Sequence, residues 1–256
     1  MHRVFVGATS RSPEHQVRRE IRLIPPQPQA GQRAPNYRKD KMLPSENRSH
    51  SGLFLALGSE KIPYLFQLLQ QGFMVRVRVG CSVRAVLSRQ LNISPEFLEG
   101  RIKTIFLDGK PVDDMDSTII KAGSTLALSA ALPGLAGATL RRGGPYASLR
   151  SQITHPRDEA PVAQQEGFIV LKLFNLLMDE MGPALLHRGV FIKKEVLKEF
   201  LKNLPKDFWA ECQAPQADGK EVKVDELLAG NWPENEDPVR IRVEARDPIH
   251  KNQKGE

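Results

Sequence analysis

The chain of 256 residues carries a formal charge of +7 and has only two cysteines. Two cysteines exclude a disulfide framework, a zinc site built from cysteines and a four-cysteine iron–sulfur centre. The six histidines are too scattered along the sequence to form a ligand cluster, so we expect neither a metal nor a cofactor.

The N-terminal region, residues 1–51, is interspersed with proline, arginine and glutamine, and no apolar face recurs in it. We expect a disordered basic arm; the alternative is that translation begins internally, at Met42. The apolar run Val4–Val6 is too short for a signal-peptide core. The uncharged stretch 122–140 contains Pro133 and three glycines, so we expect no membrane segment and a soluble, cytoplasmic protein.

The pattern of residues 52–132 predicts a first α+β unit. Gly72 is expected to end its first helix, and the alternating run that follows turns Arg76 and Arg78 outward. In chain order we predict a strand at 52–57, a helix at 59–71, a strand at 73–79, a helix from Ser82, a turn at 94–100, a strand at 102–107, a hairpin turn at Asp108-Gly109 and a strand at 124–129.

Residues 166–245 are expected to form a second unit with the same order of elements. We predict a strand at 168–173, a helix at 174–181 that stops at Gly182, a strand at 184–192, a helix at 194–204, a turn at Asp218-Gly219 and a strand at 238–243. Residues 133–165 are expected to be a glycine-rich basic linker, and residues 246–256 a polar tail.

The two units repeat at an offset of 110 positions. Ten identities fall between residues 72 and 112 and their counterparts, at helix stops, helix stripes and hairpin turns. They are Gly72/Gly182, Arg78/Arg188, Val86/Val196, Leu87/Leu197, Leu91/Leu201, Pro95/Pro205, Asp108/Asp218, Gly109/Gly219, Lys110/Lys220 and Val112/Val222.

A unit with this order of elements buries a core by curling a mixed sheet around its main helix, which is the layout of a β-grasp domain. The residues also resemble the small sulfur carriers, the molybdopterin-synthase small subunit and the thiamine sulfur carrier. The resemblance lies in Ile169–Phe174 running into Met181-Gly182, in the helix near Lys194, and in Asp108–Val112 followed by Lys121–Leu126. It implies an α+β fold of two tandem β-grasp (ubiquitin-like) units.

Sulfur carriers act through a free C-terminal Gly-Gly that is adenylated and converted to a thiocarboxylate. This chain ends Lys254-Gly255-Glu256, but it contains an internal Gly143-Gly144 that resembles a carrier tail. Only cleavage after Gly144 would expose the carboxylate. The alternative is a flexible linker with arginines that aid solubility.

Cys81 precedes a predicted helix start, where the helix dipole and two nearby arginines would lower the pKa of its thiol. It is therefore a candidate reactive thiol, with a small buried residue as the alternative. The carboxylates of Asp113, Asp114 and Asp116 are expected to form a solvated turn rather than a metal site.

We expect a non-enzymatic interaction module, because no nucleophile–base pair and no paired acids can be named. Exposed strand edges and a basic face would contact a protein partner. The candidate binding residues are Arg76, Arg78, Arg84, Arg141 and Arg142. The alternative is an RNA-binding accessory protein that uses the basic face of the first unit; aromatic residues are expected to be sparse there, so that binding would be mostly to phosphate.

Overall fold

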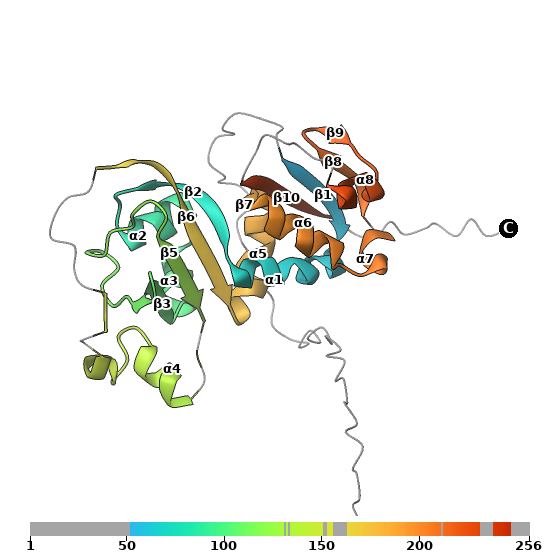
Figure 1. Cartoon of the computed structure of the whole chain (residues 1–256). Helices are drawn as coiled ribbons and strands as arrows, with labels where there is room; N and C mark the ends of the chain where they lie inside the picture. The colour runs from blue at the N-terminus through green and yellow to red at the C-terminus, as the bar shows by residue number, and fades with distance from the viewer. Residues whose placement is uncertain are drawn as a thin grey trace, which may run out of the picture. The chain divides into compact units, whose positions relative to one another are not determined.

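The structure, a computed structural model, describes residues 52–130, 132, 134–150, 153–155, 163–210, 212–230 and 238–246 (Figure 1). They form an α+β fold with one mixed ten-stranded sheet. This confirms the α+β class that the sequence predicts. The predicted arm at 1–51 and the predicted tail beyond residue 246 lie outside the described residues.

In these residues the strands are β1 (Leu53–Gly58), β2 (Phe73–Val79), β3 (Thr104–Leu107), β4 (Lys110–Pro111), β5 (Thr125–Ser129), β6 (Gln165–Phe174), β7 (Val190–Ile192), β8 (Gln213–Ala217), β9 (Lys220–Glu221) and β10 (Val239–Arg246). The helices are η1 (Ser59–Leu65), α1 (Phe66–Gln71), α2 (Val83–Ala85), η2 (Val86–Gln90), α3 (Pro95–Gly100), α4 (Gly134–Leu140), η3 (Ala147–Arg150), α5 (Leu176–Arg188), α6 (Lys194–Lys202), α7 (Lys206–Ala210) and α8 (Val224–Ala229). Across the sheet the strands lie in the order β4-β3-β5-β6-β2-β7-β10-β1-β8-β9.

The two halves of the sheet repeat one pairing pattern. In half A, β3 is antiparallel to β4 and β5, β5 is parallel to β6, and β6 is antiparallel to β2. In half B, β8 is antiparallel to β9 and β1, β1 is parallel to β10, and β10 is antiparallel to β7. The halves meet where Met74 of β2 pairs with Phe191 of β7. Each strand of one half therefore has a counterpart in the other.

The chain does not pass through the halves one after the other. Residues 73–174 supply all the strands of half A, and half B takes β1 from before this segment and β7 to β10 from after it. As a result β1 lies between β10 and β8, and β6 lies between β5 and β2. The strand pairing thus crosses the predicted unit boundaries at 52–132 and 166–245.

The two Asp-Gly turns have the same local geometry. Asp108 and Asp218 have φ of 49° and 51°, as a type I′ hairpin turn requires. Oδ1 of Asp108 accepts a hydrogen bond from the N–H of Thr125 (2.6 Å), and Oδ1 of Asp218 accepts one from the N–H of Gly52 (2.7 Å). Each carboxylate ties its hairpin to the start of the neighbouring strand in the sheet, which is β5 in half A and β1 in half B.

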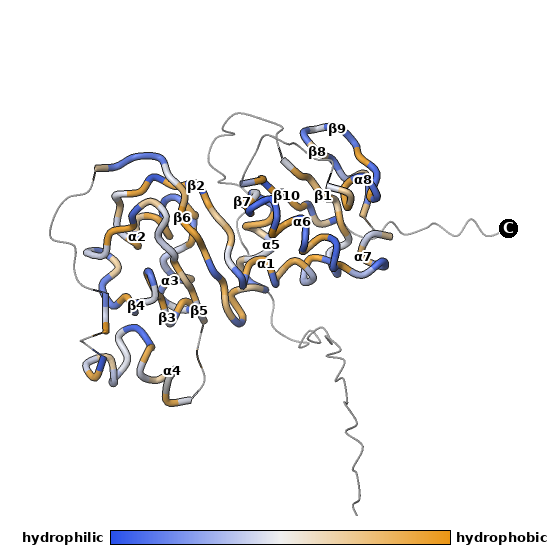
Figure 2. Tube along the Cα trace, viewed as in Figure 1, coloured by the Kyte–Doolittle hydropathy of each residue, from blue (hydrophilic) through white to orange (hydrophobic). Residues whose placement is uncertain are grey.

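Alternate residues of a strand point to the same side of a sheet. The buried residues of the strands share one side, so the core lies on one face of the sheet. In β2 the alternation is as predicted: the buried residues are Phe73, Val75, Val77 and Val79. The helices α2 and η2 add Val83, Val86 and Leu87 to the same core. Figure 2 shows hydrophobic residues along the central strands and hydrophilic ones over the β8–β9 hairpin.

The segment after β6 differs from its prediction. Instead of a helix that stops at Gly182 and a strand at 184–192, the chain forms one helix, α5, that continues through Gly182 and Pro183. Only Val190–Ile192 form a strand. The helix ends at Gly189, which has φ of 94° and caps two carbonyls of the last turn.

Gly182 serves the packing of two helices and does not stop one. A Cβ at this position would lie 2.9 Å from Leu69 Cδ1 and 3.0 Å from Phe66 Cε1, both on α1. The missing side chain lets α1 and α5 approach closely. The prediction thus identified the right kind of residue for a helix end but chose the wrong glycine.

Candidate binding face

Arginine and phenylalanine side chains gather on the face of the sheet opposite the core, where β2, β7 and β10 meet. The alternation in β2 turns Arg76 and Arg78 outward, and the same alternation in β10 turns Arg240 and Arg242 outward. Only one strand, β7, lies between β2 and β10, so these arginines lie close to one another across the sheet. The arginine–phenylalanine face consists of Arg76, Arg240, Arg242, Phe168 and Phe191.

Aromatic rings occupy the centre of this face. The rings of Phe168 on β6 and Phe191 on β7 meet edge to face, with centroids 5.0 Å apart. The guanidinium carbon of Arg76 lies 5.3 Å from the centroid of Phe168 and 5.7 Å from that of Phe191, within cation–π range. Arg242 lies 5.8 Å from the ring centroid of Phe54 on β1. The expectation that aromatic residues are sparse here is therefore wrong.

Arg240 is the most constrained cation of the face. Its Nη2 donates to the carbonyl of Arg188 (2.9 Å), and Nε of Arg242 donates to the carbonyl of His187 (3.1 Å), at the C-terminal end of α5. Nε of Arg240 is buried and has no hydrogen-bond partner among the described residues. Burial, together with the charges of Arg242 and Arg76, lowers the pKa of Arg240. An anion placed among these like charges would relieve their repulsion.

Arg78 lies at the edge of the same face and is exposed. Its Nε is 3.8 Å from Oε1 of Glu166, and both side chains are more than half exposed. An ion pair of this kind contributes little, because water screens it. Arg78 therefore stays accessible to a partner.

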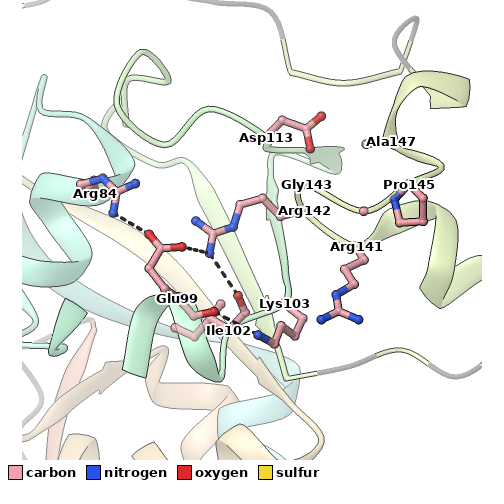
Figure 3. A pocket seen from close by; sticks show the side chains of 11 residues that line it. Arg84, Glu99, Ile102, Lys103, Asp113, Arg141, Arg142, Gly143, Pro145 and Ala147 are labelled. Carbon is pink, nitrogen blue, oxygen red and sulfur yellow. Dashed lines mark hydrogen bonds and ion pairs between the residues drawn. The ribbon is translucent and has the colours of Figure 1, made fainter. Parts of the chain in front are cut away.

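A pocket of about 660 Å³ brings together five other residues that the sequence singled out (Figure 3). They are Arg84, Arg141, Arg142, Gly143 and Gly144. The pocket thus joins the candidate carrier tail to three of the candidate binding arginines. Arg76 and Arg78 do not line it.

Two of the pocket's arginines are bound to the protein's own carboxylates. Glu99 accepts from Nη1 of Arg84 at 2.8 Å and from Nη2 of Arg142 at 2.9 Å (Figure 3). Nε of Arg84 also donates to Asp116 (2.8 Å). The hydrogen bond from Arg84, aided by the charge of Arg142, holds the pKa of Glu99 below its ordinary value. The charges of Arg84 and Arg142 are therefore already paired within the protein.

Arg150 anchors the segment that forms the wall of the pocket. Its side chain is only 3% exposed and forms a two-pronged ion pair with Asp113, at 2.9 and 2.7 Å. It also donates to the carbonyls of Thr139 (2.6 Å) and Arg141 (3.3 Å). The part of the predicted linker 133–165 that contains α4 and η3 is thereby tied to half A.

Gly143 and Gly144 lie in a turn of this anchored segment. Gly143 has φ of 62°. The N–H of Gly144 donates to the carbonyl of Arg141 (3.1 Å), and the carbonyl of Gly144 accepts from the N–H of Ala147 (3.0 Å). The bond that would have to be cut to release a carrier tail is therefore held inside a hydrogen-bonded turn.

The candidate thiol Cys81 is half-buried and packs against the core. Burial raises the pKa of the other thiol, Cys212, to about 11. Among the described residues, no group of three or more His, Cys, Asp or Glu side chains could hold a metal ion. Asp113 and Asp116, which the sequence assigns to a solvated turn, keep part of their side chains exposed and also pair with Arg150 and Arg84.

No family model matches the chain, and neither a curated protein nor a solved structure matches it. No helix in the part of the chain that the structure describes is long and apolar enough to cross a membrane. The class that the fold defines is an α+β chain with one mixed ten-stranded sheet. The resemblance to small sulfur carriers stays a prediction.

Proposed function

We propose that this chain is a non-enzymatic interaction module, built from two β-grasp-like units, that binds an anionic macromolecule through the arginine–phenylalanine face. The observation that carries the proposal is the cluster of Arg76, Arg240 and Arg242. None of the three forms an ion pair with a carboxylate of the described residues. Clustered cations without counter-charges attract anionic partners over long range.

The contrast between the two arginine-rich sites supports this choice. In the pocket, Arg84 and Arg142 both pair with Glu99, and Arg84 also pairs with Asp116. On the arginine–phenylalanine face, the cations bind backbone carbonyls and rings, which orient them without cancelling their charge. The repeated strand pairing of the two halves supports the β-grasp-like description.

The test is elution from immobilised heparin, used as a generic polyanion. The variant Arg76→Ala/Arg242→Ala is compared with Lys202→Ala/Lys206→Ala, which removes two exposed charges on α6 and α7. We expect the first variant to elute at clearly lower salt than the native chain and the second to elute close to it. An equal shift for both pairs would show that only net charge matters, and the proposal would fail.

The sulfur-carrier alternative requires cleavage after Gly144. The turn around this residue, held by Arg150, argues for an intact segment. Intact-mass measurement of the native protein decides it: a species that ends at Gly144, especially one heavier by the replacement of oxygen with sulfur, would favour the carrier.

A further inference from the structure

We infer that the anionic partner is a single-stranded nucleic acid, whose phosphates contact Arg76, Arg240 and Arg242 and whose bases stack on Phe168 and Phe191. The inference rests on the proposed function and names its partner. It follows from the register of the strands and the position of the rings.

The strand register arranges the cations as a band across the sheet. Met74 and Arg240 both pair with Phe191 of β7. Arg76 and Arg242 each lie two residues further along strands that run in the same direction, so they share a row. With β7 between them, their strands are about 10 Å apart. A band of this kind can follow a chain of phosphates.

Gly189 makes room for the side chain of Arg240 on this face. It directly precedes β7, whose pairing with β10 ends at Val190, and it has φ of 94°. A Cβ at this position would lie 2.7 Å from Nε of Arg240. The glycine therefore lets the Arg240 guanidinium pack against the backbone here and reach the carbonyl of Arg188.

The aromatic centre favours a nucleic acid over an acidic protein. An acidic peptide needs only cations, whereas bases stack on aromatic rings, at about 1–3 kcal/mol per base. Phe168 and Phe191 are half-buried and do not belong to the buried core. Arg76 lies over both rings, and a guanidinium plane is itself a surface on which bases stack. Arginines interleaved with rings on a sheet face are the arrangement that single strands use.

Binding is measured by fluorescence anisotropy with a fluorescein-labelled 12-mer of oligouridylate and, separately, a labelled 12-residue polyglutamate. We expect the oligouridylate to bind and the logarithm of its Kd to change with log salt with a slope of magnitude about 2, since three phosphate contacts contribute about 0.7 each. Arg76→Ala should reduce the slope by about 0.7.

The ring variants separate stacking from charge. Phe168→Leu/Phe191→Leu should weaken oligouridylate binding about tenfold or more while leaving the salt slope unchanged. Phe106→Leu, a half-buried phenylalanine on β3, is the matched control and should bind normally. Circular dichroism and the melting temperature verify that each variant is folded.

Each result decides between the two proposals. Binding of polyglutamate without binding of oligouridylate would overturn the nucleic-acid inference and leave the interaction module standing. Oligouridylate binding that the ring variants do not weaken would also overturn it, because stacking would then play no part. Failure of both ligands at low salt would overturn the inference and the proposed function together.

Discussion

At the scale of single residues, Arg150 is the side chain on which the segment 134–150 most depends. Arg150→Met removes the partner of the Asp113 carboxylate and leaves the carbonyls of Thr139 and Arg141 short of a donor. Asp113 is one-third exposed, so we expect a cost of about 2 kcal/mol, below that of a fully buried pair. Hydrogen exchange of this segment should then be about 30-fold faster.

The exposed Arg141 provides the control for this measurement. Among the described residues, no carboxylate pairs with its side chain, so Arg141→Met should leave hydrogen exchange of the segment within a few-fold of the native rate. Equal protection in both variants would mean that Arg150 does not anchor the segment.

Cys212 gives a prediction for alkaline pH. Its thiol has a pKa of about 11 in the folded chain because burial disfavours the thiolate, whereas an unfolded cysteine ionises near pH 8.5, roughly. The stabilisation is complete below the unfolded pKa and is lost as pH rises towards the folded pKa, since only the unfolded chain releases the proton.

The measurement compares urea unfolding of the native chain and Cys212→Ala. Between pH 8 and 11 the stability of the native chain should fall more steeply than that of the variant, because the variant lacks the thiol. The other titrating groups act on both chains and cancel in the difference. A constant difference across this range would contradict the prediction. Iodoacetamide should also label Cys212 slowly at pH 8 in the folded chain and quickly in urea.

Gly182 is the residue through which α1 and α5 meet. Gly182→Val would place methyl groups against Leu69 and Phe66, and overpacking of this kind costs about 1–3 kcal/mol. Gly100 is the matched control, because a Cβ there has nothing within 4 Å. Urea midpoints should fall for Gly182→Val and change little for Gly100→Val. A native midpoint for Gly182→Val would show that the helices can separate without loss.

At the scale of elements, local patterns predicted most of half A and the shared hairpins correctly. Ser82 caps α2, Ser94 caps α3, and the Asp-Gly turns lie where they were expected. These features depend on neighbouring residues, so a single sequence is enough to identify them.

The predicted offset of 110 positions matches equivalent elements of the two halves at the Asp-Gly hairpins. It does not match the ends of the helices α1 and α5. The glycines that end α1 and α5 are Gly72 and Gly189, not Gly72 and Gly182. The offset changes because β2 has seven residues and β7 only three, and because β7 leads directly into α6. A gap-free comparison cannot show a shortened strand, and the glycine required by helix packing stood where a stop was expected.

The arginine–phenylalanine face was half predicted for a related reason. The alternation of valine and arginine in β2 was recognised as a candidate surface, and the same alternation in β10 was recognised only as a strand. Nothing local indicates that β7 brings the two strands together, or that Phe168 and Phe191 meet there. Such contacts depend on strand order, which a single sequence leaves open.

At the scale of the whole molecule, the route of the chain predicts different behaviour for the two halves. A fragment of residues 73–174 contains every strand of half A, so it should fold and unfold cooperatively in urea. A fragment of residues 176–246 lacks β1, which lies between β10 and β8, and it should stay unfolded by circular dichroism.

Addition of a peptide of residues 52–71, which contains β1, tests whether the absence of β1 keeps the fragment 176–246 unfolded. If the missing central strand is the cause, the peptide should induce β structure in the fragment 176–246, with an apparent Kd that reflects its burial. A folded 176–246 fragment without the peptide would contradict the assigned role of β1.

The parallel pairing of β1 with β10 has a consequence for synthesis on the ribosome. The first described strand emerges early, whereas its two partners in the sheet, β8 and β10, belong to the last part of the chain to be made. Half A is complete once residue 174 has emerged, and roughly 70 further residues, about 4–14 s of translation, separate it from the closing strand. The strands in the middle of the nascent chain can therefore pair first. The apolar strand β1 stays uncovered until the later strands of half B have been made.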